Sequence, residues 1–197
     1  MAGIAEAMGL DQLEVSGLRA AGYLHDIGKV AVDKRLFAKP SALDEEEFRE
    51  MADHTVVGHQ IVQGVEFPWP KVPEVVRSHH ERTDRTGYPD HLAADEISTP
   101  ARITAVADTF DAMTSERPYR SGLSVGEALS EIARIAPLKF DANAVQALMV
   151  QVRRDAVGRK ENRFLDDRIV CNIAPADIDV LASALNHKIT HGKIYSA

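Results

Sequence analysis

The spacing of apolar residues is the feature that most restricts what this chain can fold into. Apolar positions recur at intervals of three and four in most segments, whereas the strict alternation typical of half-buried strands is scarce. The segment from Asp11 to Ile27 is predicted to be a helix, with four residues facing inward: Leu13, Leu18, Ala21 and Leu24. The pattern predicts an all-α fold.

Capping residues mark where further helices are predicted to begin in the rest of the chain. Asp44 precedes three consecutive glutamates, and this order both caps a helix and suits its dipole. Thr99 offers a capping hydroxyl directly before Pro100. The same spacing predicts helices at about 55–63, 73–80, 100–115, 124–136, 142–154 and 175–185. The stretches EFPWPKVP and RTDRTGYPDHL, which separate helices, are predicted to be ordered loops.

The domain organisation follows from length and from one polar run. At 197 residues the chain can form one sizeable core with a small appendage. We expect a compact multi-helix bundle over residues 1–154, with its first helix incomplete, and a short C-terminal extension over 155–197 that begins in the polar run DAVGRKENR. The extension could pack back on the core, mediate a homodimer, or begin another module.

Composition excludes several classes of protein. The formal net charge of -7 argues against DNA or RNA as partners, although a local group of arginines could still bind a small phosphorylated ligand. The chain contains no apolar run of about 18 residues and no signal peptide, so we expect no membrane segment and a cytoplasmic location. The single cysteine, Cys171, leaves histidine and carboxylate as the side chains available to hold a metal.

Histidine and aspartate gather in four short segments that could carry chemistry. Each alone is equally compatible with capping or surface residues, but together they form a mixed imidazole and carboxylate set, which suits divalent ions with five or six ligands. Such a set predicts a two-metal hydrolytic centre in which Asp26, with its two oxygens, is the natural bridge. The segments hold His25-Asp26, His54, His79-His80, and Asp108 with Asp111.

Five motifs carry a resemblance to a known family: LHDIGK, HTVVGH, HHERTDRTGYP, AVADTFDAMTSERPYR and KFDANAV. In order and spacing they resemble the HD-GYP domain, a subgroup of the HD phosphohydrolase superfamily, from about Ala2 to Val152. Members are bacterial signal-transduction enzymes that hydrolyse cyclic di-GMP to pGpG and in many cases to GMP. The resemblance implies an HD-domain bundle and metal-dependent phosphodiester hydrolysis by a hydroxide that bridges two metal ions.

The resemblance also implies roles for individual residues. Iron or manganese is expected as the metal, with two ions bound. Lys29 and Asp111 are the implied catalytic residues, which would orient the hydroxide or assist proton transfer. Substrate contacts are implied for Tyr88 of the Gly-Tyr-Pro turn and for the phosphate-binding Arg117 and Arg120. The implied metal ligands are His25, Asp26, His54, His79, His80 and Asp108.

The sequence departs from the family pattern in two places. Arg85 stands where the family usually has glycine. A further histidine ligand usually lies on a helix upstream of the segment AGIAEAMGL, and it is not in this sequence. We therefore expect the second ion to bind more weakly than the first. The chain is interpreted either as a fragment of a longer protein, with a regulatory domain upstream, or as a weakened member that binds one ion firmly.

Two alternatives to hydrolysis of cyclic di-GMP remain open on the sequence. The chain could be a catalytically weak sensor module that binds cyclic di-GMP or a partner protein. It could also act on another phosphoester, such as a nucleotide.

Overall fold

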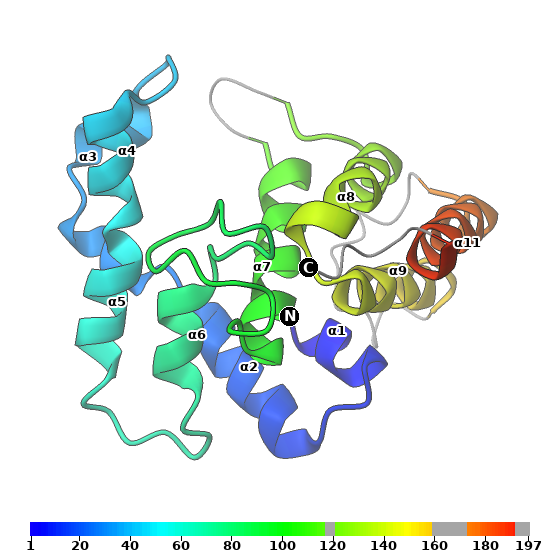
Figure 1. Ribbon diagram of the computed structural model, residues 1–197, viewed down its shortest axis with the longest axis horizontal. Coiled ribbons are helices and arrows are strands. Elements are labelled where there is room, and N and C mark those ends of the chain that lie inside the picture. Colours follow the sequence, from blue (N-terminus) through cyan, green and yellow to red (C-terminus); the bar gives the residue numbers. More distant parts are fainter. Residues whose placement is uncertain (117–120, 159–172, 192–197) are drawn as a thin grey trace. The chain divides into compact units, whose positions relative to one another are not determined.

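Helices make up the fold in the computed structural model, which describes residues 1–116, 121–158 and 173–191. Within these ranges the only pairing of extended backbone is an isolated bridge between Asp84 and Ala93, so the all-α prediction is confirmed. None of the helices in these ranges combines the length and apolar character needed to cross a bilayer. The elements, labelled as in Figure 1, are α1 (Ala2–Ala7), α2 (Gln12–Leu24), the 3-10 helix η1 (Ile27–Ala31), α3 (Lys34–Ala38), α4 (Glu45–Ala52), α5 (His54–Val62), α6 (Val72–Ser78), α7 (Thr99–Thr114), α8 (Val125–Lys139), α9 (Ala142–Val157) and α11 (Pro175–His191).

The chain divides into two compact units. The first consists of Met1–Ala2 and Asp11–Ala105, and the second of Gly3–Leu10 and Val106–Ala197. Helices α2 to α6 belong to the first unit, whereas α8, α9 and α11 belong to the second. Helices α1 and α7 each contribute residues to both units.

The core of the first unit forms where α2 packs on α6 and where α5 packs on both α6 and η1 (Figure 1). Trp69, which is 5% exposed, fills this core beside α2. A Cβ atom on Gly17 would lie only 2.3 Å from the Trp69 ring, so the absence of a side chain at Gly17 lets the indole pack against the helix. Apolar side chains from α2 and α6 complete the core: Val15, Leu18, Ala21, Val72, Val75 and Val76.

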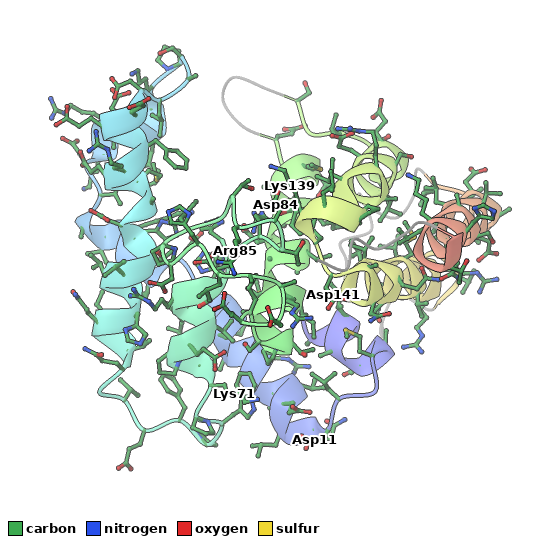
Figure 2. The ribbon with its side chains drawn as sticks, viewed as in Figure 1. Asp11, Lys71, Asp84, Arg85, Lys139 and Asp141 are labelled. Atoms are coloured by element: carbon green, nitrogen blue, oxygen red, sulfur yellow. The ribbon has the colours of Figure 1, made fainter. Side chains whose placement is uncertain are left out.

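The core of the second unit lies between α8, α9 and α11 (Figure 1). Asp141 caps α9 by accepting the N–H groups of Asn143 and Ala144, and its position at the start of that helix is marked in Figure 2. Helix α11 packs against both α8 and α9. The large side chains buried here are Leu129, Ile132, Leu148, Met149, Ile178 and Leu185.

Helix α2 differs from its predicted form in two respects. The helix ends at Leu24 with His25 as its C-cap, and the chain then turns into η1, so the predicted continuation to Ile27 is wrong. Leu13, predicted to face inward, is 51% exposed, whereas Val15 is 2% exposed. At 100° per residue Leu13 lies about 140° around the helix from the buried Leu18, which places it outside the core-facing arc. The start of the helix is as predicted, with Asp11 as its cap (Figure 2).

The other predicted helices are present with shifted ends. Asp44 caps α4 by accepting the N–H groups of Glu46 and Glu47, as predicted. The first helical hydrogen bond of α7 runs from Arg102 N–H to the Ser98 carbonyl, so Ser98 occupies the cap position expected for Thr99. Helix α11 continues to His191, beyond its predicted end, and the short helix α3 was not predicted.

Candidate metal centre

Four of the predicted ligands gather in the first unit. Asp26, His54, His79 and His80 each offer one ligand atom, and these atoms all lie within 4.8 Å of one another. His54 and His79 are fully buried, whereas Asp26 and His80 are partly exposed. The set combines three imidazoles with one carboxylate, which is a donor set typical of first-row transition metals.

The last turns of three helices orient three histidine rings. The Nδ1 atom of His25 lies 2.8 Å from the Gly22 carbonyl oxygen at the end of α2. The corresponding distances are 2.6 Å from His54 to Met51, at the end of α4, and 2.8 Å from His79 to Val76, at the end of α6. A carbonyl oxygen can only accept a hydrogen bond, so each Nδ1 carries the proton and each Nε2 is left with a lone pair for a metal.

Asp26 lies where these Nε2 atoms converge. Its Oδ1 is 3.4 Å from His54 Nε2 and 4.0 Å from His79 Nε2, and it is buried without a hydrogen-bond donor among the described residues. Its Oδ2 accepts a hydrogen bond from Lys29 Nζ at 2.6 Å and lies 3.4 Å from His25 Nε2. A buried carboxylate oxygen without a donor is costly, and a divalent cation among these atoms would satisfy it. The residues present therefore fit a metal ion.

The electrostatics of His54 also suit metal binding. Burial lowers the pKa of His54 below its ordinary value, although the hydrogen bond to the Met51 carbonyl and the nearby Asp26 carboxylate both favour the protonated form. The ring is therefore held neutral at physiological pH, and the neutral imidazole is the form that coordinates metals.

Two glycines bring Asp26 and His54 together. A Cβ atom on Gly28 of η1 would lie 1.9 Å from the His54 carbonyl oxygen and 2.5 Å from the Gly58 backbone nitrogen. The main chains of η1 and α5 are therefore in direct contact, which no other residue at position 28 would permit without displacement. The sequence contained a signal for this approach, since Gly28 lies three residues after His25 in LHDIGK and Gly58 lies four residues after His54 in HTVVGH. These glycines were not predicted to matter.

Aromatic side chains flank the cluster. The Tyr88 ring lies 4.7 Å from the His80 ring, centroid to centroid, with an angle of 31° between the planes. Phe48 of α4 meets Tyr88 edge to face at 5.6 Å and is half exposed. Phe48 was not identified from the sequence, where a single phenylalanine among glutamates gave no functional signal.

The remaining predicted site residues lie outside this cluster. Asp108 and Asp111 are on the part of α7 that belongs to the second unit, where Asp108 is partly buried and Asp111 is exposed. Arg117 and Arg120 fall outside the described residues. Every role assigned from the sequence stays a prediction: the ligand roles of His25, Asp26, His54, His79, His80 and Asp108, the catalytic roles of Lys29 and Asp111, and the substrate contacts of Tyr88, Arg117 and Arg120.

Comparison with known proteins identifies the family. Residues 1–144 match the family model described as the HD domain. The chain belongs to the HD domain family. The family expected from the sequence motifs is thereby confirmed. Of the His-Asp pair in the motif LHDIGK, Asp26 belongs to the four-residue cluster, and His25 lies beside it, with its Nε2 3.4 Å from Asp26 Oδ2.

This HD domain is similar to phosphodiesterases from several organisms. A cyclic di-GMP phosphodiesterase of Thermotoga maritima is 39% identical over 147 residues, which cover 74% of this chain and 40% of the relative. The cyclic di-GMP phosphodiesterase response regulator RpfG of Xanthomonas campestris is 37% identical, with 74% of this chain and 39% of the relative covered. The 3'3'-cGAMP-specific phosphodiesterase 3 of Vibrio cholerae is 39% identical, with 74% and 31% covered. The chain spans less than half the length of these relatives.

Proposed function

We propose that this HD domain is a metal-dependent phosphodiesterase that hydrolyses cyclic di-GMP to pGpG and further to GMP. The observation that carries the proposal is the buried Asp26 Oδ1, which has no hydrogen-bond donor among the described residues and faces the Nε2 atoms of His54 and His79. The relatives named as cyclic di-GMP phosphodiesterases support the choice of substrate.

Six side chains are proposed to hold the metal ions. Asp26, His54, His79 and His80 would hold one divalent ion, and the family resemblance implies His25 and Asp108, with Asp26 shared, as the residues that would hold a second. Iron and manganese are the metals proposed, because both accept nitrogen and oxygen ligands in octahedral geometry. When bound, such ions polarise a phosphoryl oxygen and make hydroxide available near neutral pH.

Proton handling and substrate contacts complete the proposal. Lys29, whose ammonium group lies 2.6 Å from Asp26 Oδ2, holds that carboxylate in place and, with Asp111, is proposed to move the proton of the attacking water. Arg117 and Arg120 are proposed to bind the phosphate, and Tyr88 to line the cleft beside His80. A homodimer, an upstream regulatory domain and a cytoplasmic location also stay proposals.

The proposal is tested by turnover of the metal-loaded chain. The protein is loaded with Mn²⁺, or with Fe²⁺ under anaerobic conditions, and the conversion of cyclic di-GMP to pGpG and GMP is followed by chromatography. Asp26→Asn is expected to lower the rate at least about 100-fold, because it removes the charge from the carboxylate at the centre of the cluster. Asp53→Asn is the matched control, since Asp53 is exposed and stands next to His54 without a place in the cluster.

Other outcomes would point to other functions. Binding of cyclic di-GMP without product under every metal would contradict hydrolysis and favour the sensor alternative. The similarity to a 3'3'-cGAMP-specific enzyme favours a second candidate substrate, so both cyclic dinucleotides are compared at equal concentration. A higher kcat/KM for 3'3'-cGAMP, or for a mononucleotide ester, would replace cyclic di-GMP as the proposed substrate.

A further inference from the structure

Glu81 is a buried acid directly after the two adjacent histidines. Its side chain is 1% exposed, and both carboxylate oxygens accept hydrogen bonds from the main chain. Oε1 accepts the Asp90 N–H at 2.7 Å, and Oε2 accepts the Leu92 N–H at 3.0 Å. A buried carboxylate is costly unless it is satisfied in this way, so the two hydrogen bonds hold the far side of the loop onto the residue that follows His80.

A second attachment holds the same loop from its exposed side. The Arg77 guanidinium on α6 binds the Asp90 carboxylate through two hydrogen bonds of 2.7 Å. Asp90 is therefore fixed twice, by its N–H to Glu81 and by its side chain to Arg77. Bidentate arginine pairs of this kind restrict geometry as well as adding energy.

These hydrogen bonds fix the part of the loop that directly follows Tyr88, and further contacts fix the part that precedes it. Its N–H donates to the His80 carbonyl at 3.3 Å. At Gly87 a Cβ atom would lie 2.3 Å from the Arg82 nitrogen and 2.5 Å from the Glu81 Cα, so the turn is pressed against the start of the loop. With both sides of the turn fixed in this way, the Tyr88 ring is held 4.7 Å from the His80 ring.

We propose that Glu81 is a positioning residue for substrate binding: by holding the Asp90 and Leu92 N–H groups, it fixes the Tyr88 ring beside His80 in the orientation that receives the cyclic dinucleotide. The proposal rests on the function proposed above. Glu81 itself does not touch the substrate, and it acts through Tyr88. Its effect therefore falls on substrate affinity more than on the chemical step.

The first test is Glu81→Gln in the full chain. The amide keeps the shape of the carboxylate, but its NH₂ group faces one N–H donor, so one of the two hydrogen bonds is lost. We expect KM for cyclic di-GMP to rise about tenfold while kcat changes less than about threefold. Glu96→Gln is the matched control, because Glu96 also accepts a main-chain N–H of this region, that of Ala93 at 2.7 Å, but is exposed. Its KM is expected to stay within about twofold of the wild type.

A double-mutant cycle with Tyr88→Ala separates positioning from general stability. If Glu81 acts through Tyr88, Glu81→Gln changes KM less than about twofold in the Tyr88→Ala background. An undiminished tenfold effect in that background would overturn the proposal, as would an unchanged KM in the single variant. Amide hydrogen exchange of Asp90 and Leu92 provides a readout independent of activity, because their protection is expected to fall in Glu81→Gln and to be kept in Glu96→Gln.

Two further measurements cover a variant that does not fold and a wild type that binds without turnover. If Glu81→Gln does not fold, Arg77→Gln loosens the same loop from its exposed side and enters the same cycle, with an expected rise in KM of about threefold that vanishes in the Tyr88→Ala background. If the wild type binds cyclic di-GMP without hydrolysing it, the cycle is measured on the Kd by calorimetry. Turnover or binding that is insensitive to Glu81 overturns this inference alone, whereas a wild type that neither binds nor hydrolyses cyclic di-GMP overturns the proposed function as well.

Discussion

Arg85 lies in the left-handed region of the backbone, with φ of 64°, in the loop between α6 and α7 (Figure 2). This conformation brings its Cβ close to the following carbonyl and costs an L-residue about 1–2 kcal/mol, a cost that glycine does not carry. A left-handed φ suits the glycine that the HD-GYP pattern usually has at this position, and Arg85 departs from that pattern at the cost of this strain. The Arg85 side chain recovers little of this energy, since it lies 3.6 Å from Glu96 at the surface.

We therefore expect Arg85→Gly to stabilise the protein. The free energy of unfolding, measured with urea, should rise by about 0.5–1 kcal/mol, because relief of strain exceeds the entropy cost of glycine in the unfolded chain. Arg85→Ala keeps the strained conformation and should change the free energy by less than about 0.5 kcal/mol. Equal effects of the two substitutions would show that backbone strain is not the cause.

Asp90 makes the free energy of unfolding depend on pH in the acidic range. The hydrogen bond from Arg77 lowers the pKa of Asp90 below its ordinary value, with the charge of Arg77 contributing further. A lowered folded-state pKa means that the pair stabilises the fold above the unfolded value and that this contribution is lost as the pH falls through the folded value.

The expected difference between wild type and Asp90→Asn follows from this sign. At about pH 7 the variant should be less stable by about 0.5–1 kcal/mol, and at about pH 3, below the ordinary pKa of an aspartate, the difference should be smaller. Urea unfolding of both proteins at the two pH values checks this, since other acid effects are common to both. If the difference in the free energy of unfolding were the same at both pH values, the charge of Asp90 would not be its cause.

At the residue scale, sequence reasoning found the residues of the cluster but not the groups that support them. Asp26, His54, His79 and His80 were recognisable because imidazole and carboxylate in one chain are the usual metal donors. Glu81 lies in the motif HHERTDRTGYP, but its role was not predicted, because only the folded loop brings the N–H groups of residues 90 and 92 to it.

The contact between η1 and α5 decides how closely Asp26 approaches His54. We expect Gly28→Ala to destabilise the protein by at least about 2 kcal/mol and to reduce the metal bound per chain, because the new Cβ would overlap the His54 carbonyl oxygen and push the two elements apart. Thermal unfolding and metal analysis after desalting measure the two effects.

Gly64→Ala is the matched control for this substitution. Apart from Gly64 itself and its two neighbours in the chain, no residue has an atom within 4 Å of the position where the Cβ would be. The stability of this variant should therefore stay within about 0.5 kcal/mol of the wild type, and its metal content should be unchanged. A tolerated Gly28→Ala would mean that η1 and α5 can separate without affecting the cluster.

At the scale of elements, apolar spacing predicted which segments are helical but not where they end. Helix α2 stops at Leu24 because the chain must turn to bring η1 against α5, a tertiary requirement that the pattern from Asp11 to Ile27 does not contain. Capping residues gave better boundaries, as Asp44 shows, because a cap is a local interaction between residues two and three apart.

Metal binding should stabilise the first unit of the molecule, because the four residues of the cluster come from three separate places in the chain: the start of η1, the start of α5 and the end of α6. Mn²⁺ at about 100 times its Kd is expected to raise the free energy of unfolding by about 2.7 kcal/mol, and a chelator should remove this gain. Trp69 is the single tryptophan of the chain and is buried in the first unit, so its fluorescence reports the unfolding of that unit. The shift should be absent in Asp26→Asn, and an equal shift in that variant would place the metal elsewhere.

The division of the whole molecule could not be predicted from the sequence. Residues Gly3–Leu10 belong to the second unit, although about a hundred residues of the first unit follow them in the chain. The approach is close, since a Cβ atom on Gly3 would lie 2.7 Å from the Gln151 side chain. Contacts between residues so distant in sequence leave no periodic signal, because each helix shows only that it has an apolar face and not which helix covers it.

The main-chain carbonyls that orient His25, His54 and His79 have a consequence for how this sequence can evolve. Every residue type has a carbonyl oxygen, so no substitution at Gly22, Met51 or Val76 can delete the acceptor itself. Side-chain partners of metal-bound histidines, by contrast, can be lost in a single mutational step. The ring orientations are therefore protected against sequence drift as long as the ends of α2, α4 and α6 keep their places, and distant homologues can differ at these three positions without losing the arrangement.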